Sequence, residues 1–291
     1  MNTTDLGGRF TFPKTSMTVN RMGYGAMQLA GPGVFGPPSD PGTAIKVLQE
    51  VIESGINHID TSDFYGPYVT NELIRKALSP YPDGLVIVTK VGCFRGPDKS
   101  WNPALSSADL TKAIHENLQH LGLEALDVVN LRVGGLEGPT DTSISEPFSV
   151  LADLQRQGLI RHLGLSNVSP AQLREAQAIA EVVCIQNMYN VAHREDDSFI
   201  EDLDRQGIAY VPFFPLGGFT PLQSSTLSDV AASLETTPMQ VAQAWLLQRS
   251  PNILLIPGTS SLAHLRENIQ AASLTLPPEA VAELDGIAAE N

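Results

Sequence analysis

Three side chains that could exchange a proton with a substrate follow two neighbouring apolar runs of the chain. Asp60 ends the run 57–60, Tyr65 follows five residues later, and Lys90 ends the next run, 85–90. Runs of this length and composition are typical of parallel strands that are buried on both faces. Because the carboxyl ends of parallel strands meet at one edge of a barrel or sheet, we expect an acid, a phenol and an amine to share one pocket.

This trio is suited to delivering a proton to a carbonyl oxygen. A phenol ordinarily titrates near pH ~10, which is high for proton exchange at neutrality. A lysine ammonium about 4 Å away is worth roughly 4 kcal/mol at an effective dielectric constant near 20, and could lower the pKa of Tyr65 by up to ~3 pH units before burial opposes it. Asp60 would keep Lys90 charged, which makes Tyr65 a candidate general acid. Taken alone, the same residues also fit a structural Asp60–Lys90 ion pair and a tyrosine that packs a turn.

The elements that must position these residues alternate regularly along the chain. Strands are predicted at 21–25, 57–60, 85–90, 127–131, 160–165, 182–186, 208–211 and 253–256. Helical patterns lie between them, as where Leu110, Ile114 and Leu118 recur every fourth residue. Ser106 and Asp109 can cap that helix through a capping box.

The alternation predicts an α/β fold, a (β/α)8 TIM barrel. Eight strand–helix repeats with no linker between them favour one barrel domain over residues 1–291 rather than an open sheet. Ahead of the first strand, residues 9–12 and 17–20 have the pattern of a short hairpin. We expect this hairpin to cap the bottom of the barrel.

A doubly wound dinucleotide-binding domain is the main alternative fold. Gly31, Gly33 and Gly36 match the pattern G-x-G-x-x-G in letters. No predicted strand leads directly into the segment, Pro32 removes an amide donor inside the turn, and a Pro-Pro pair follows where the helix should begin. The context therefore disfavours a Rossmann dehydrogenase.

The same residues carry a resemblance to a known family. Residues 57–66 resemble the signature around the catalytic aspartate and tyrosine of the aldo-keto reductase family, and the run ending at Lys90 resembles the strand with the family's catalytic lysine. The resemblance implies reduction of an aldehyde or ketone with NADPH, with Asp60, Tyr65 and Lys90 as catalytic residues. Further segments match the family in order and spacing: 23–25, 164–167, 186–190, 215–217 and 256–268.

Within the family, two segments look most like a bacterial branch associated with pyridoxal reduction. They are residues 28–33 and residues 127–132. The resemblance makes pyridoxal a candidate substrate. A cationic Arg132 could meet a phenolate or another anionic oxygen beside the aldehyde.

The resemblance also implies a nicotinamide cofactor that lies extended across the top of the barrel. Ser166, Asn167 and Gln186 would hold its carboxamide, and Phe213 would stack on the nicotinamide ring. The pyrophosphate would lie under residues 216–223, and the segment from 258 would hold the adenosine phosphate at a helix N-terminus, where backbone amides bind anions. The other positions implied to contact NADP(H) are Gly25, Pro215, Leu216, Gly217, Gly258, Thr259, Ser260, His264, Glu267 and Asn268.

Two positions depart from the pattern of the family. Arg132 stands at the end of the fourth predicted strand, where the family usually has a catalytic histidine. Because arginine stays charged at every accessible pH, its role would be electrostatic, toward the substrate oxygen or, if it turns away, toward an acid such as Glu137. His264 stands where an arginine commonly reads the 2′-phosphate, with Arg266 two residues on.

Charge and composition exclude several classes of partner. The chain has 18 Lys and Arg against 32 Asp and Glu, a formal net charge of −14, and no local basic patch, so we expect no nucleic-acid partner. No apolar run of about 18 residues and no apolar signal core occur, which predicts no membrane span and a cytoplasmic location. Cys93 and Cys184 are expected to be reduced thiols. We expect a small-molecule carbonyl substrate, no metal, and a monomer or small homo-oligomer.

Two other functions are compatible with these residues. A non-catalytic, cofactor-sensing subunit on the same barrel can keep Asp60, Tyr65 and Lys90, but should expose an apolar docking patch or carry a longer N-terminal tail. An aldolase or isomerase would use Lys90 as a Schiff-base nucleophile. Borohydride would trap the covalent adduct of that enzyme with a carbonyl substrate.

The cofactor prediction can be tested by the pH dependence of binding. We expect tighter binding of NADPH than of NADH, through the hydroxyls of residues 259–261 together with His264 or Arg266. If His264 reads the 2′-phosphate, the ratio of the two dissociation constants should shrink as pH rises through the range in which imidazoles lose their proton, near ~6.5. If Arg266 does, the ratio should be flat with pH. Equal affinity for both cofactors at low pH would contradict the assignment.

Overall fold

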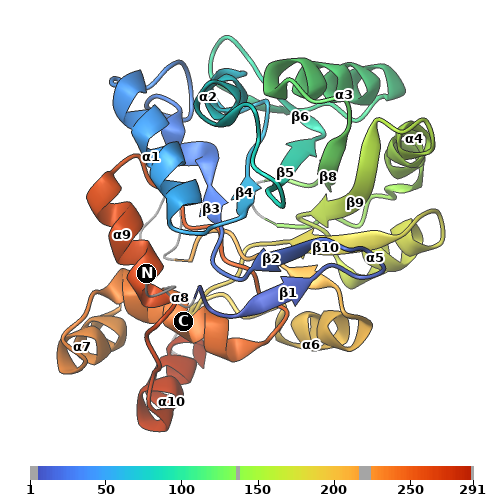
Figure 1. Cartoon of the computed structure of the whole chain (residues 1–291). Coiled ribbons are helices and arrows are strands. Elements are labelled where there is room, and N and C mark those ends of the chain that lie inside the picture. Colours follow the sequence, from blue (N-terminus) through green and yellow to red (C-terminus); the bar gives the residue numbers. More distant parts are fainter. Residues whose placement is uncertain (1–5, 136–137, 216–223, 290–291) are drawn as a thin grey trace.

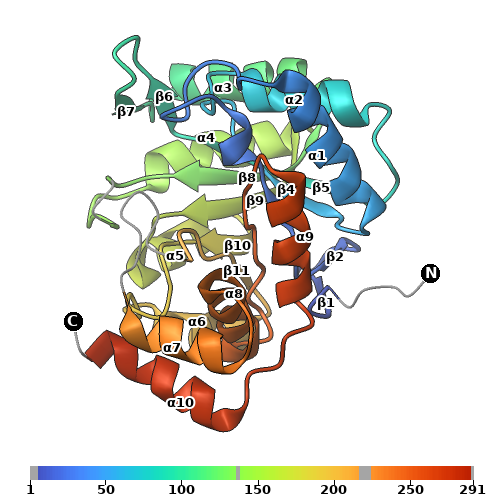
Figure 2. The ribbon, with the colours of Figure 1, turned by 90° about the vertical axis from the view of Figure 1, so that its left-hand side faces the viewer.

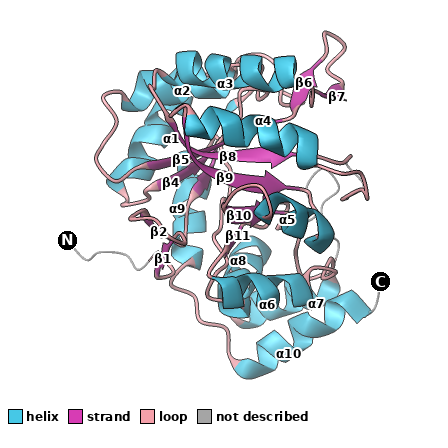
Figure 3. Cartoon of the chain, turned by 90° about the vertical axis from the view of Figure 1, so that its right-hand side faces the viewer, coloured by secondary structure: helices cyan, strands magenta, loops and turns pink. Residues whose placement is uncertain are grey.

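A curled parallel sheet forms the centre of the protein (Figure 1 and Figure 3). The computed structural model describes residues 6–135, 138–215 and 224–289. In hydrogen-bonding order, the strands are β3 (Tyr24–Gly25), β4 (His58–Asp60), β5 (Val86–Val91), β8 (Leu126–Arg132), β9 (Ile160–Ser166), β10 (Val182–Gln186) and β11 (Ala209–Tyr210). Each pairs in parallel with its neighbours; Lys90, for example, lies opposite Asn130, and Arg132 opposite Ser166.

The segment around Ile253 and Leu255 closes this sheet into a barrel. Ile253 forms a parallel bridge to Tyr210 of β11, and Leu255 forms one to Met22, just before β3. The Gly23 N–H donates to the Leu255 carbonyl at 2.8 Å. Because this eighth segment touches both edges of the sheet, the predicted (β/α)8 barrel is confirmed. The predicted strand 253–256 is present as these single bridges rather than as a continuous ladder.

Helices surround the barrel on its outside (Figure 2). They are α1 (Pro41–Glu53), α2 (Val69–Leu78), α3 (Ser107–Leu121), α4 (Ser145–Arg156), α5 (Pro170–Gln177), α6 (Asp197–Gln206), α7 (Ser225–Ser233), α8 (Pro238–Arg249), α9 (Leu262–Ala271) and α10 (Pro278–Gly286), with 3-10 turns η1 (Ala26–Leu29) and η2 (Ile287–Ala289). Ser106 caps α3 as predicted, since its Oγ accepts the Asp109 N–H at 3.2 Å, but Asp109 does not complete the predicted capping box: its Oδ2 accepts from Ser106 Oγ instead of from the Ser106 N–H. Among the described residues, no helix is long and apolar enough to cross a bilayer.

The strands divide their side chains between two cores. On β5, Ile87 belongs to the large core between the sheet and the helices. Its neighbours Val86 and Val88 belong to a second core inside the barrel. Side chains alternate between the two faces of a strand, so Lys90 is the next inward-facing residue after Val88. The last inward layer at the carboxyl ends is therefore where polar groups appear.

The amino-terminal hairpin lies at the opposite end of the barrel. It consists of β1 (Arg9–Thr11) and β2 (Thr18–Asn20), which pair antiparallel. Phe12 and Val19 pack into the core inside the barrel. Asn57, just before β4 begins, accepts the Asn20 N–H at 2.8 Å and donates to the Thr18 carbonyl at 3.0 Å. The predicted cap on the barrel bottom is confirmed.

A second hairpin was not predicted from the sequence. The loop after β5 contains β6 (Cys93–Arg95) and β7 (Trp101–Pro103), paired antiparallel. The strands are only three residues long and the connection is rich in polar residues, glycine and proline, so no alternating pattern marks them. They rise from the carboxyl end of β5 and so stand beside the site described below.

The seam between the first and last strands leaves no room for a side chain at Gly25. A Cβ there would lie 2.5 Å from the carbonyl oxygen of Ile256. We predict that Gly25→Ala costs roughly 1–3 kcal/mol, the range for overpacking, and lowers the Tm by several degrees. Gly286→Ala is the control, because a Cβ there meets nothing within 4 Å. Thermal unfolding of both variants is the measurement. An unchanged Tm for Gly25→Ala would show that the backbone at the seam can move to make room for the added methyl group.

Candidate active site

The last inward-facing position of each of five strands carries a polar side chain. The alternation described above places them on one level at the carboxyl end of the barrel. They are Asp60 on β4, Lys90 on β5, Arg132 on β8, Ser166 on β9 and Gln186 on β10. This layer thus contains two residues of the predicted trio, Asp60 and Lys90, and three of the other predicted site residues.

A buried ion pair occupies the centre of this layer. Lys90 Nζ lies 2.6 Å from Asp60 Oδ1, and the two side chains are 7% and 4% exposed. Lys90 also donates to the Thr61 carbonyl at 3.0 Å, and Gln186 Nε2 donates to Asp60 Oδ2 at 2.9 Å. Burial alone would lower the pKa of Lys90, but Asp60 and Tyr65 raise it above its ordinary value. The ammonium is therefore held charged at neutral pH.

Tyr65 lies against this pair, on the loop between β4 and α2. Its side chain is buried, and Lys90 Nζ lies 5.1 Å from the centre of its ring. Burial raises the pKa of Tyr65 above its ordinary value, even though Lys90 and Arg132 both act to lower it. Lys90 lowers this pKa as predicted, but desolvation of the phenolate outweighs the ammonium, so the net shift is upward. The phenol is therefore fully protonated at neutral pH, which is the state a proton donor needs.

Arg132 points toward the same space. Its Nη1 donates to Ser166 Oγ at 3.4 Å, its Nη2 donates to the Gly135 carbonyl at 3.3 Å, and its Cζ lies 5.3 Å from the centre of the Phe213 ring. Burial lowers the pKa of Arg132, while Tyr65 acts in the opposite direction. The alternative partner Glu137 lies outside the described residues.

Gln186 and Ser166 fit the carboxamide of a nicotinamide. Gln186 Oε1 is a buried acceptor with no hydrogen-bond partner among the described residues. An amide N–H₂ from a ligand would satisfy it. Asn167 is committed differently: its Nδ2 donates to the carbonyls of Val133, Gly135 and Gly138. These hydrogen bonds hold the loop after β8. A contact between the Asn167 side chain and the carboxamide would therefore use Oδ1.

The next predicted contacts follow β11. Phe213 is half-buried and forms a parallel bridge to Met188, beside β10, and its ring makes an edge contact with Phe214. Pro215 is half-buried as well. The ring of Phe213 lies close to Arg132, at the rim of the polar layer. Leu216 and Gly217, with the predicted pyrophosphate loop 216–223, lie outside the described residues.

The segment predicted to hold the adenosine phosphate leads into the N-terminus of α9. Ser261 caps the helix by accepting the His264 N–H at 3.4 Å, and Thr259 Oγ1 accepts the Ser261 N–H at 3.0 Å. Ser260 and His264 are exposed. A helix N-terminus with exposed polar side chains fits an anionic group.

The rest of this segment is tied to its surroundings. Gly258 approaches the backbone of Gly25, whose carbonyl oxygen would lie 2.7 Å from a Cβ at 258. Asn268 Oδ1 accepts a hydrogen bond from Gln243, and the Glu267 carbonyl accepts one from Gln240. Arg266 forms a bidentate ion pair with Glu50, at 2.6 and 3.0 Å, so its charge is already balanced. Of the two basic residues considered for the 2′-phosphate, this geometry favours His264.

One wall of the site was missed from the sequence. Val34, Phe64 and Tyr65 form a small apolar cluster with Cys93 and Trp101 of the second hairpin. The ring of Trp101 makes an edge contact with Phe64, with ring centres 5.8 Å apart.

Arg95 locks this wall in place. Its Cζ lies 3.9 Å above the Trp101 ring, and its guanidinium donates to the carbonyls of Gly33, Val34 and Lys99. The aromatic residues on either side of the glycine-proline turn at 96–97 were the available signal. Among the described residues, no group of His, Cys, Asp or Glu side chains could hold a metal ion.

Comparisons with known proteins agree with this geometry. A sequence model of the aldo/keto reductase family matches residues 21–289. The chain is 66% identical to pyridoxine 4-dehydrogenase of Escherichia coli K12 over 96% of its own length and 99% of that protein. It superposes with a TM-score of 0.80 on a thermostable aldo-keto reductase, Tm1743, at 29% identity, covering 96% of this chain and 99% of the other.

A further solved structure is an aldo/keto reductase from Klebsiella pneumoniae in complex with NADP and acetate. Its TM-score is 0.77 at 22% identity, with 95% of this chain and 94% of the other covered, so it shares the fold. The family match and the high identity extend over almost the whole barrel, including the carboxyl-end layer described above. The chain therefore belongs to the aldo/keto reductase family of NADP(H)-dependent oxidoreductases.

Proposed function

We propose that this protein reduces an aldehyde to an alcohol with NADPH, with Tyr65 as the proton donor. The observation that carries the proposal is the buried Asp60–Lys90 pair beside a protonated Tyr65, on the same level as the unpartnered oxygen of Gln186. An acid, a cation and a vacant amide acceptor in one layer are what hydride and proton delivery to a single carbonyl requires.

The bound nicotinamide supplies the hydride, and the side chains supply the proton and the electrostatics. As negative charge develops on the carbonyl oxygen, the Tyr65 hydroxyl donates its proton to it. Lys90, 5.1 Å from the ring centre, stabilises the phenolate that is left, and Asp60 holds the ammonium in place. Arg132 lies on the same level and stabilises the oxygen electrostatically, since a guanidinium holds its own proton at any accessible pH.

The cofactor site follows from the same layer. Gln186 and Ser166 would hold the carboxamide, which would satisfy the unpartnered Gln186 Oε1, and Phe213 would contact the nicotinamide ring. The N-terminus of α9, where Ser260 and His264 are exposed, would hold the 2′-phosphate.

The substrate we propose is pyridoxal, reduced at its aldehyde to pyridoxine. The support is the 66% identity to an E. coli protein named pyridoxine 4-dehydrogenase, together with the local chemistry. Phe64 and Trp101 offer aromatic edges beside Tyr65, which suit a flat ring. Arg132 offers a cation for the oxygen next to the aldehyde.

The free thiols of Cys93 and Cys184 support a cytoplasmic enzyme.

The ion pair also weighs against the Schiff-base alternative. A Schiff-base lysine must be neutral to attack a carbonyl. Lys90 is buried against Asp60 and its pKa is raised, so it is held as an ammonium. Borohydride with pyridoxal should therefore leave no adduct on Lys90.

Replacing the phenol tests the proposal. Tyr65→Phe should lower the rate of pyridoxal reduction by roughly 10²–10⁴-fold, the usual loss when a general acid is removed. NADPH binding should be retained, because the phenol is not a proposed cofactor contact. The measurements are NADPH oxidation followed by absorbance and NADPH affinity followed by fluorescence.

A matched control lies on the same loop. Tyr68→Phe removes a hydroxyl from a ring that is 42% exposed and should keep the wild-type rate. Reduction by Tyr65→Phe within a few-fold of wild type would show that another group delivers the proton.

Replacing Arg132 tests its electrostatic role. Arg132 lowers the pKa of Tyr65, so Arg132→Ala should raise it and move the alkaline limb of the reduction rate to higher pH. The rate on the plateau should fall, because a stabilising cation is lost. Arg132→Lys keeps the charge, so its limb should stay close to that of wild type. If the alkaline limb and the plateau rate of Arg132→Ala both match those of wild type, Arg132 takes no part in the reaction.

A further inference from the structure

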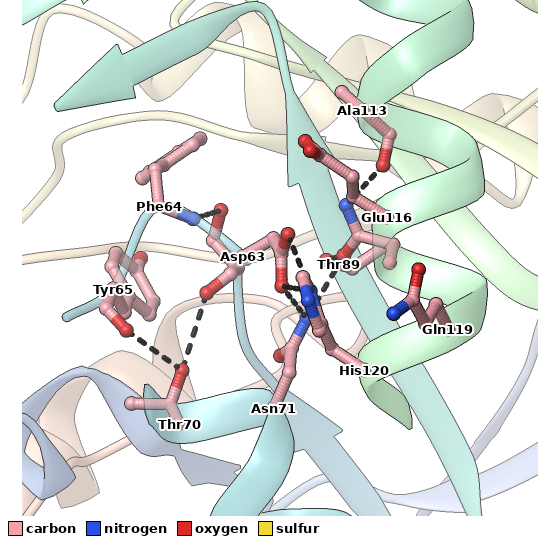
Figure 4. A network of polar contacts seen from close by, with 12 residues as sticks. Asp63, Phe64, Tyr65, Thr70, Asn71, Thr89, Ala113, Glu116, Gln119 and His120 are labelled. Atoms are coloured by element: carbon pink, nitrogen blue, oxygen red, sulfur yellow. Dashed lines mark hydrogen bonds and ion pairs between the residues drawn. The ribbon is translucent and has the colours of Figure 1, made fainter. Parts of the chain in front are cut away.

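A buried acid–imidazole pair lies under the loop that carries Tyr65 (Figure 4). Asp63, on that loop, is 7% exposed. Its two carboxylate oxygens lie 2.9 and 3.0 Å from Nδ1 of His120, which stands in the last turn of α3 with a side chain that is 15% exposed. The chemistry proposed above uses neither side chain.

Hydrogen bonds connect this pair to Lys90. Asn71 Nδ2 donates to Asp63 Oδ1 at 3.0 Å, and Asn71 Oδ1 accepts from Thr61 Oγ1 at 2.8 Å. The carbonyl of Thr61 in turn accepts from Lys90 Nζ at 3.0 Å. Three residues, Asp63, Asn71 and Thr61, thus link the imidazole of His120 to the ammonium that faces Tyr65.

A second branch reaches the strand on which Lys90 stands. Asn71 Nδ2 also donates to Asn117 Oδ1 at 3.1 Å, and Thr89 Oγ1 donates to the same oxygen at 2.6 Å. Thr89 directly precedes Lys90 on β5. The network therefore ties α2, α3 and β5 to one point behind the site.

The same network holds the loop itself. The Tyr68 N–H donates to the Asp63 carbonyl at 2.7 Å, and Thr70 Oγ1 donates to the Ser62 carbonyl at 3.2 Å and approaches the Tyr65 carbonyl at 3.5 Å. The Tyr68 ring lies on His120, with ring centres 4.4 Å apart. A shift of Asp63 would thus be transmitted to the backbone of Tyr65.

The charge of Asp63 is costly without a counter-charge. Burial raises the pKa of Asp63 to about 6, although His120 acts to lower it. The pKa of this carboxyl is higher in the folded protein than in the unfolded chain, where it is ~3.9. Its contribution to the free energy of unfolding is therefore fully present at low pH and is lost as pH rises through about 6. At neutral pH the buried carboxylate is therefore a net cost, which a positive imidazolium offsets.

The other charged groups nearby leave this role to His120. On α3, Glu116 raises the pKa of Asp63 and lies 3.7 Å from Lys112, which is mostly exposed. On α2, Arg75 donates to the Gln119 carbonyl at 3.0 Å. The remaining charged neighbours, Glu72 and Lys76, line an open cavity of about 350 Å³ beside His120 together with Arg75, Ser79 and Gln119.

We propose that His120 is a positioning residue for the reduction: its imidazolium neutralises Asp63 and so keeps the loop 61–70 in the form that places the Tyr65 hydroxyl against Lys90. The inference rests on the proposed role of Tyr65. Without this positive charge, the buried carboxylate of Asp63 has no counter-charge and the loop loosens. The turnover rate then falls, while the affinity for NADPH is unchanged.

Two substitutions at His120 separate charge from shape. His120→Gln keeps a hydrogen-bond donor but has no charge. His120→Arg keeps a charge at every pH, and the adjacent cavity gives its longer side chain room. The double variant Asp63→Asn with His120→Gln removes both charges, so that no lone carboxylate is left buried.

The first measurement is the pH profile of kcat with pyridoxal and NADPH. His120→Gln should lower kcat by about 10- to 100-fold, as small misplacements of catalytic groups do, with the Kd for NADPH within two-fold or so of wild type. His120→Arg should restore kcat, because it returns a positive charge beside Asp63. The double variant should recover part of the loss. A kcat profile of His120→Gln identical to wild type would overturn the proposal, and so would a loss that His120→Arg fails to restore.

The second measurement is hydrogen exchange of the backbone amides, which needs no substrate. In His120→Gln the backbone amides of residues 61–70 should exchange faster than in wild type, while the amides of the barrel strands keep their exchange rates. This result stands even if Tyr65→Phe shows that another group is the proton donor, so the two proposals can fail separately. Unchanged exchange in this loop, or faster exchange spread evenly over the barrel, would contradict a positioning role.

Discussion

The buried ion pair between Lys90 and Asp60 is the interaction on which the rest of the site depends. Removing one partner of such a pair typically costs about 3–5 kcal/mol, because the other charge is left buried without a partner. Here the neighbouring groups are arranged so that both charges persist: Gln186 donates to the second oxygen of Asp60, and Thr61 accepts from Lys90. This keeps a fixed positive charge beside Tyr65 in a site from which water is largely excluded. A cation held in this way stabilises a developing phenolate without reorganisation during the reaction.

The barrel explains why these groups meet. Strands that are apolar on both faces must alternate between the inner and the outer core, so the last inward residue of each strand reaches the same rim. Val86 and Val88 fill the inner core below Lys90, and the hairpin residues Phe12 and Val19 close that core at the far end. A polar layer at one end is therefore compatible with a dry interior. Below that layer His58 is buried, and burial lowers its pKa to about 4, so it adds no charge to the site at neutral pH.

Most of the barrel could be predicted from the sequence, because apolar runs and capping residues are local signals. The strand 182–186 was predicted with its observed bounds, and Ser106 caps α3 as expected. Asp60, Tyr65 and Lys90 could be singled out because each follows or ends such a run, and their grouping in space is what the structure adds. Other features depend on contacts between distant segments and leave no local pattern. The clamp of Arg95 on residues 33 and 34, the pairing of Arg266 with Glu50, and the pairing of Asp63 with His120 are of this kind. The raised pKa of Tyr65 was missed for a related reason, since the depth of its burial depends on the second hairpin.

The measurement that tests the central role of the ion pair most directly is single-turnover oxidation of NADPH by the double variant Asp60→Asn with Lys90→Met. The double variant removes both charges together, so the fold is spared a lone buried charge. If the ammonium is what makes Tyr65 an effective proton donor, the step that oxidises NADPH should slow by about 100-fold or more, while NADPH still binds and the Tm stays close to that of wild type. A single-turnover rate near that of wild type in this folded, cofactor-binding variant would show that the Lys90–Asp60 pair is structural and that the reaction draws its proton from elsewhere.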